Sequence, residues 1–105
     1  MTDGFINEAT LGGTIFIPVQ CRNGSDVPVE PDSAPIYTVV GPDGVAVSGE
    51  TGTMTLTPAS ITGLRGVVLT VSAANGYAAD SGYAVHVAYA ISSTNYAAML
   101  TIKVT

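Results

Sequence analysis

The residues that could carry acid–base chemistry are few in this chain and lie far apart. Its one histidine, His86, stands in the middle of an alternating run of alanines and bulky residues. Nucleophilic catalysis needs a nucleophile, a base and an orienting group, and a catalytic base is usually placed at a strand end or in a loop that substrate can reach. We therefore expect His86 to be structural or interfacial, and we expect the chain not to be an enzyme.

Metal binding is the next chemistry to consider. Asp26, Glu30 and Asp32 cluster in a proline-containing segment and offer the oxygen ligands that Ca²⁺ prefers. Their spacing matches no EF-hand loop, and solvated loop acids are the simpler interpretation. Cys21 and His86 are too few for a structural zinc site, which needs four ligands. We expect neither a metal nor a cofactor.

Carbohydrate binding would need exposed aromatic side chains. Tyr37, Tyr77 and Tyr96 could supply a stacking platform, but the chain has no tryptophan, and packing inside the domain is the simpler role. The sequence Gly41-Pro42-Asp43-Gly44 is not a phosphate-binding loop, because it opens onto a strand and not onto a helix N-terminus.

Composition limits the kinds of partner. Eight acids face three bases among 105 residues, for a formal net charge of −5, which argues against nucleic acid and anionic membranes. We see no signal peptide and no transmembrane helix. Charged residues make up 10% of the chain, against about 25% in ordinary soluble domains. A small domain cannot hide so much apolar material inside itself, so we favour a protein whose faces are covered by partners over one with a neutral Ala/Gly/Thr/Ser surface.

Short alternating segments separated by Gly, Asn and Asp predict an all-β fold, an antiparallel Ig-like β-sandwich of about seven strands. The proline of Gly41-Pro42-Asp43-Gly44 and the positive φ available to Gly44 predict a hairpin turn, and Asn23-Gly24 predicts another. Pro18 suggests that the first strand is an edge strand. Residues 1–12 show no sustained period and are interpreted as an N-terminal arm to a domain of residues 13–105. The expected strands cover residues 14–21, 36–40, 45–47, 53–58, 67–71, 83–91 and 96–104.

The strand of residues 83–91 has two unlike faces. Its bulky face is expected in the core together with residues of three other strands. These core residues are Tyr83, Val85, Val87, Leu69, Val71 and Ile36. Its smooth face is apolar too, and a strand that is apolar on both faces is expected to be central and covered twice. We expect this smooth face and the arm to contact neighbouring subunits; the alternative is that the face packs under the connector of residues 26–35. The interface residues expected on this basis are Phe5, Ile6, Leu11, Ala84, His86, Ala88 and Ala90.

Short motifs in a characteristic order add a resemblance. Asp80-Ser81-Gly82-Tyr83 is similar to the tyrosine corner of immunoglobulin-like sandwiches, although the paired cysteines and the core tryptophan of antibody domains are missing. The order of segments resembles small Ig-like virion proteins of tailed bacteriophages. The segments are Asp32-Ser33-Ala34-Pro35-Ile36-Tyr37, a Gly-bearing hairpin, Thr62-Gly63-Leu64, Gly76-Tyr77 and the strand of residues 83–87. Arg65 departs from the pattern, because an aromatic residue is commoner after that turn.

The resemblance implies a structural component of the particle, in the first place a capsid decoration or cement protein. Its partners would be the major capsid protein or other virion subunits, and the chain would be a homo-oligomer or present in many copies. It would be located in the virion, assembled in the cytoplasm of the host bacterium. The alternative is an accessory Ig-like module of the neck, tail or fibre with an adhesion or carbohydrate-binding role.

Overall fold

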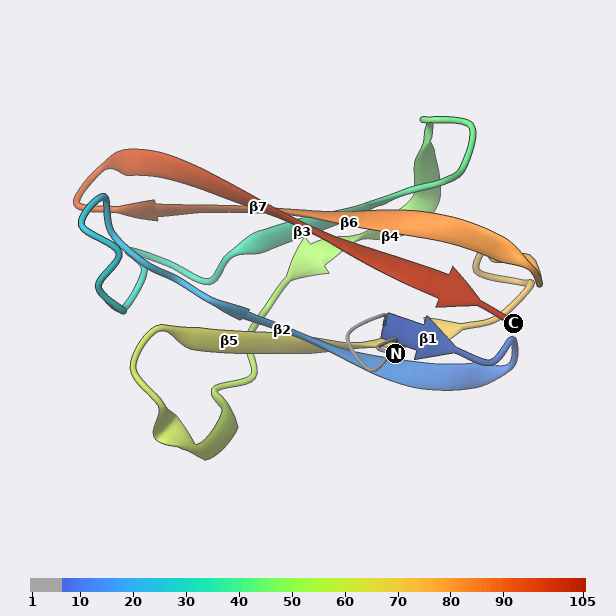
Figure 1. Ribbon diagram of the computed structural model, residues 1–105, viewed down its shortest axis with the longest axis horizontal. Helices are drawn as coiled ribbons and strands as arrows, with labels where there is room; N and C mark the ends of the chain where they lie inside the picture. The colour runs from blue at the N-terminus through green and yellow to red at the C-terminus, as the bar shows by residue number, and fades with distance from the viewer. Residues whose placement is uncertain (1–6) are drawn as a thin grey trace, which may run out of the picture.

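The computed structural model describes residues 7–105. They form two packed β-sheets, with the five-stranded sheet above the two-stranded one in Figure 1. The larger sheet has the strand order β1-β7-β6-β3-β4, and the smaller one pairs β2 with β5. The elements are β1 (Asn7–Ala9), β2 (Gly13–Gln20), β3 (Ile36–Val40), β4 (Ala46–Thr53), the 3-10 turn η2 (Pro58–Ser60), β5 (Leu64–Val71), β6 (Ser81–Ile91) and β7 (Thr94–Val104).

The predicted all-β sandwich is confirmed, with one change to its pairing. The strands β3, β4, β6 and β7 are joined by antiparallel pairs, as are β2 and β5. β1 instead runs parallel to the end of β7, with Asn7 opposite Ile102 and Ala9 opposite Val104, so the larger sheet is mixed. Placing β2 and β5 in one sheet and β3, β6 and β7 in the other is the arrangement of an immunoglobulin-like sandwich. Within residues 7–105, no helix is long and apolar enough to span a membrane.

The core lies between the two sheets and follows from the period-two alternation of the long strands. Tyr83, Val85 and Val87 of β6 are buried, as are Leu69 and Val71 of β5, and all five were predicted to be core residues. They pack with Ile17 of β2, Val39 of β3 and Ile102 of β7. The expectation for Ile36 is wrong: its side chain is 54% exposed, because Tyr37 and Val39 are the residues of β3 that pair with core positions of β6.

A tyrosine corner closes one end of the core, as the sequence around Tyr83 predicts. The Tyr83 hydroxyl accepts a hydrogen bond of 2.7 Å from the backbone N–H of Ala78, five residues upstream. The ring meets that of Tyr77 edge to face, with the ring centroids 5.0 Å apart. One side chain thus ties the loop before β6 to the packed interior.

Both predicted turns are present. The second is closed by the Asp26 N–H, which donates to the Asn23 carbonyl, but its positive φ is on a residue other than Gly24. Gly44 has φ +80° at the tip of the β3–β4 hairpin, and the Gly41 N–H donates to the Val45 carbonyl across that turn. Gly24 does not adopt positive φ. In that loop it is Asp26, at φ +61°, that takes the left-handed conformation.

Residues 53–58 were expected to form a strand, and this prediction is wrong. The backbone of Met54 bonds to Pro35, whereas Leu56 makes an isolated bridge to Gly66 of β5. The segment therefore crosses from one sheet to the other, and Pro58 then begins η2. Leu56 touches β5 at one point without adding a strand to the smaller sheet.

The interpretation of residues 1–12 as an arm without an element of its own is wrong for residues 7–9, which are the strand β1. The backbone of Thr105 bonds to Ala9 and Leu11, and Gly12 bonds to Val71. Residues 7–12 are therefore held within the domain.

Candidate interaction surface

The face of the larger sheet that points away from the core is the principal candidate. The registers of β3, β6 and β7 place nine side chains on it in three rows across the strands. We call these nine residues the outer face. The rows are Ile36, Ala88 and Ala97; Thr38, His86 and Met99; and Val40, Ala84 and Thr101.

The outer face is apolar and nearly uncharged. Ile36 and Met99 are its largest exposed apolar side chains, at 54% and 60% exposure. The small side chains of Ala84, Ala88 and Ala97 lie on the same face. His86 is the titratable member of the nine and lies between Thr38 and Met99. Two large apolar side chains over small ones suit contact with another protein surface more than they suit chemistry.

Four of the seven predicted interface residues come together on this side of the sheet. Ala84, His86 and Ala88 lie on the outer face, and Ala90 follows beside Asn95; all four are half-buried. Leu11 is not with them, because it packs against the hydrophobic core. Phe5 and Ile6 lie outside the residues that the structure describes.

Sequence reasoning missed the two largest members of the outer face, Ile36 and Met99. Alternation within β6 identifies its smooth side but does not say what stands beside it. The signal is the register between strands: once Ala88 is placed opposite Ile36, and His86 opposite Met99, these side chains must share a face.

The connector of residues 26–35 borders the outer face without covering it. The Asp32 N–H donates to the Ala90 carbonyl, and a hollow of about 230 Å³ lies between Ser33 and Ala34 of the connector and the ends of β6 and β7. Ala84 and His86 lie farther along β6, beyond this contact. The expectation that β6 is central is confirmed, but the described part of the chain covers only one of its two faces.

A second set of exposed apolar side chains lies on the smaller sheet, and the sequence did not point to it. Phe16 and Val68 are paired across β2 and β5 on the side away from the core, with exposures of 43% and 52%. The Phe16 ring lies over Gly66, where a Cβ atom would come within 2.5 Å of it. Both outward sides of the sandwich thus present apolar residues.

The three acids considered for Ca²⁺ are each engaged in a different structural contact. Asp32 accepts the backbone N–H groups of Ser92 and Ser93, both at 2.9 Å, in the β6–β7 turn. These bonds hold the pKa of Asp32 below its usual value, and they support two serines that have positive φ. Glu30 and Asp26 pair with arginines elsewhere. Within residues 7–105, no three His, Cys, Asp or Glu residues are placed to hold a metal ion together.

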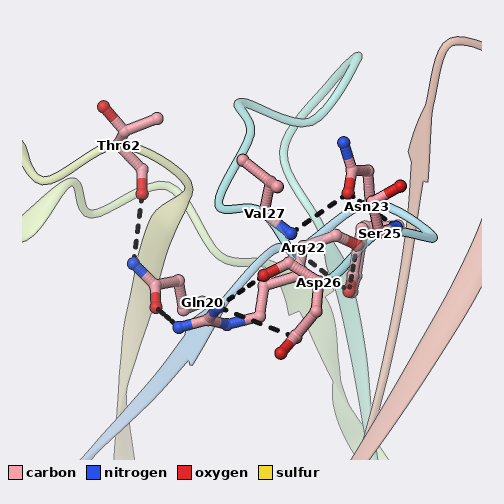
Figure 2. Close-up of polar contacts among 8 residues, drawn as sticks. Gln20, Arg22, Asn23, Ser25, Asp26, Val27 and Thr62 are labelled. Atoms are coloured by element: carbon pink, nitrogen blue, oxygen red, sulfur yellow. Dashed lines mark hydrogen bonds and ion pairs between the residues drawn. The ribbon is translucent and has the colours of Figure 1, made fainter.

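Figure 2 shows the polar contacts of Asp26 and of its neighbours in the loop after β2. Arg22 donates to the Gln20 side chain at 2.8 Å and to the Asp26 carbonyl at 2.9 Å, and its guanidinium lies 3.6 Å from the Asp26 carboxylate. The Asn23 side chain accepts the N–H groups of Ser25 and Val27. This exposed network folds the loop after β2 and leaves the Asp26 carboxylate facing an arginine.

Arg65, which departs from the phage-like pattern, has a structural explanation. Its guanidinium lies 2.6 Å from Glu30, whose other carboxylate oxygen accepts the Gly63 N–H at 2.5 Å. Gly63 has φ +77°, and a Cβ atom there would lie 2.7 Å from the Cys21 carbonyl. The Thr62-Gly63-Leu64 turn is therefore clamped to the connector by one carboxylate.

We expect the Glu30→Gln substitution to remove an acid-sensitive part of the stability. The Gly63 N–H bond, followed by the Arg65 contact, lowers the pKa of Glu30 from its ordinary value of 4.5. A carboxyl whose pKa is lowered on folding contributes stability that is present above the unfolded pKa and is lost as the pH falls through the folded pKa. In urea unfolding, the free energy of unfolding of the native protein should exceed that of Glu30→Gln at neutral pH, and this difference should close below about pH 4.5.

The same titration has a matched comparison. Arg65→Met removes the ion pair but keeps the bond from Gly63, so it should lose a smaller part of this stability than Glu30→Gln. If the difference in free energy of unfolding between the native protein and Glu30→Gln stayed constant into strong acid, Glu30 would not stabilise the turn as an anion.

Cys21 lies in the core between the two sheets, whereas His86 lies on the outer face of the larger sheet. The two side chains therefore do not form a pair. Cys21 is fully buried, and burial raises the pKa of its thiol. His86 is on the outer face. A thiolate–imidazole arrangement is therefore not present between these two residues.

The tyrosines considered for carbohydrate binding do not form an exposed platform. Tyr77 is 3% exposed and donates its hydroxyl to Glu50 at 2.6 Å; burial, followed by this bond, raises the pKa of Tyr77. Tyr37 is half-buried against the core, and Tyr96 stacks on Tyr89 with the ring centroids 5.6 Å apart.

No protein-family model matches this chain, and neither does any curated protein or solved structure with which it was compared.

Proposed function

We propose that this chain is a structural protein of a tailed-phage virion, in the first place a capsid decoration or cement protein that coats or stabilises the head. The observation that carries the proposal is the outer face. It is a nearly uncharged apolar surface on the larger sheet, and no described part of the chain covers its centre.

Burial of this surface would provide the driving force for assembly. Removing apolar surface from water is worth about 25 cal/mol per Å², and Ile36 and Met99 are each more than half exposed. The alanines between them let another backbone or sheet approach closely. Eight of the nine residues of the outer face have side chains that cannot ionise, and the ninth is His86. Docking of this face would therefore desolvate little charge.

The virion context rests on the resemblance of the sequence motifs, and several of those motifs have structural roles in the sandwich. Tyr83 forms a tyrosine corner, and Gly63 forms a turn that only a residue without a side chain fits without displacing the Cys21 carbonyl. Asp32, at the start of another motif, caps the β6–β7 turn. The partners are then the major capsid protein or other virion subunits, the chain is present in many copies, and it is located in the virion assembled in the host cytoplasm.

The second candidate is an adhesion or carbohydrate-binding module of the neck, tail or fibre. The buried position of Tyr77 gives it no support, because aromatic platforms for sugars must be exposed. Specific binding on a glycan array would favour this candidate over packing in the particle.

The proposal is tested by mass spectrometry of purified particles of the phage whose genome encodes the chain. We expect the chain in every preparation, in a large copy number comparable with that of the major capsid protein. A low copy number would move it to the neck or tail. Its absence from the particles would overturn the virion role.

A further inference from the structure

Besides the edge of the three-residue strand β1, the described part of the sandwich has four open strand edges, and these differ in how they are protected against pairing with another chain. An unpaired edge presents free backbone N–H and C=O groups and is a template for a further strand, unless proline, charge, a bulge or a covering segment blunts it. β2 carries Pro18, which lacks an N–H. β5 is bridged at Gly66 by Leu56, through bonds in both directions.

The edge of β4 is blunted as well. Gly49 has φ +81° within the strand, and the register with β3 shifts between Thr38 and Val40. Glu50 points a charge inward to the Tyr77 hydroxyl. Inward charges and irregular strands are the devices that keep sheet edges from pairing.

The remaining edge, that of β7, shows none of these devices over residues 94–100. The parallel partner β1 covers only Ile102 to Val104. The seven residues before it contain no charge and no proline, and the register of β7 with β6 runs without a shift from Thr94 to Val104. On the side of β7 that faces away from β6, no described residue forms a ladder with this stretch.

The outward backbone groups of β7 can be assigned from its far end. The Thr101 carbonyl accepts the Asn7 side chain, and both backbone groups of Thr105 bond to the segment of residues 9–11. Odd-numbered residues of β7 therefore turn their N–H and C=O groups away from β6. With a continuous register, Asn95, Ala97 and Met99 do the same.

We propose that this edge pairs antiparallel with the same edge of a second copy of the chain, about a two-fold axis near Ala97. Three outward N–H and three outward C=O groups from each copy then form about six hydrogen bonds. Asn95 faces Met99 of the second copy, and Ala97 faces Ala97.

A second copy is favoured because the edge is complementary to itself. The chain carries a net charge of −5, yet residues 94–100 are uncharged, so self-pairing places no like charges opposite one another. The small side chains of Ala97 and Ala98 at the centre admit close approach. The dimer joins two five-stranded sheets and sets two outer faces side by side, since Ala97 and Met99 belong to that face. This inference does not depend on the virion role.

Sedimentation equilibrium over a range of concentrations tests the proposal with the full chain. We expect a species of twice 10.6 kDa for the native protein. Ala97→Pro removes an outward N–H and takes nothing from the β6–β7 ladder, so it should remain folded. It removes two hydrogen bonds from the symmetric pair, each worth roughly a factor of ten, and should weaken dimerisation by about a hundredfold.

Two further substitutions complete the set. Ala97→Lys puts like charges opposite one another at the two-fold axis and tests the edge even if the proline variant does not fold. Thr70→Lys makes the same change of charge on an exposed position of β5, far from β7, and should dimerise as the native protein does.

Amide hydrogen exchange locates the contact. At high protein concentration the amides of Asn95, Ala97 and Met99 should become protected, whereas those of Tyr96 and Ala98, which already bond to β6, should not change. A native chain that stays monomeric at every concentration overturns the proposal. It is overturned even if a variant that lacks residues 2–6 forms dimers. A dimer that is lost in Ala88→Glu but kept in Ala97→Pro would place the contact on the outer face and also overturn it.

Discussion

The substitution Tyr83→Ala is expected to lower the free energy of unfolding by about 3–5 kcal/mol, as aromatic truncations in cores do. The side chain is 5% exposed, its ring packs edge to face on Tyr77, and its hydroxyl accepts the Ala78 N–H. Removing the side chain leaves a cavity beside Tyr77 and an N–H without its partner. Equilibrium unfolding in urea measures the loss.

The substitution Tyr83→Phe separates the ring from the hydroxyl. It keeps the packing and removes only the bond to Ala78, so we expect a loss of about 1–3 kcal/mol. A loss below about 1 kcal/mol for Tyr83→Ala would mean that Tyr83 is not a core residue. Equal losses for the two variants would mean that the hydroxyl, and not the ring, holds the loop.

Local alternation predicted most of the fold because the long strands bury one face. In β6, every second residue from Tyr83 to Val87 is buried, and β7 follows the same period up to Val104. The run at residues 36–40 is apolar on both of its faces, so its own pattern cannot decide which face points inward. The register between Tyr37 and Val87 decides it, and Ile36 is left outside.

The wrong predictions share a non-local cause. Residues 53–58 alternate like a strand. However, Met54 bonds to Pro35, just before β3 of the larger sheet, and Leu56 bonds to Gly66 of the smaller sheet. A segment that changes sheets can have the same local pattern as a strand. β1 is three residues long, and its partner, the end of β7, is more than ninety residues away in the sequence. No window around Asn7 to Ala9 contains that information.

The candidate site was predicted in part for the same reason. The alanine side of β6 is a property of one strand, and the sequence shows it directly. The outer face is a property of three strands, so finding Ile36 and Met99 needs the registers with β3 and β7. Leu11 could not be separated from the interface residues by its type, because a leucine near a terminus suits a core and a contact equally.

The second large effect is expected from Ala88→Glu, in the central strand of the outer face. Ala88 is half-buried between Ile36 and Ala97, and it lines the open hollow that Ser33 and Ala34 of the connector border. A glutamate there can reach water in the isolated domain, so folding should be spared. In a docked complex the same charge would be buried without a partner, which is costly enough to prevent association.

Folding and assembly of this variant are measured separately. Circular dichroism and urea unfolding should place Ala88→Glu within about 1 kcal/mol of the native protein. A largely unfolded variant would mean that the face is internal to the domain. Thr70→Glu carries the same charge on the outward side of β5 and controls for the change in net charge.

The most direct test of the interface is the amount of each variant found in purified particles, when it is produced in place of the native chain. The account predicts that Ala88→Glu is folded but missing from the particles, while Thr70→Glu is incorporated at the native level. Incorporation of Ala88→Glu at the native level would contradict it, because the outer face could not then be the surface through which the protein joins the virion.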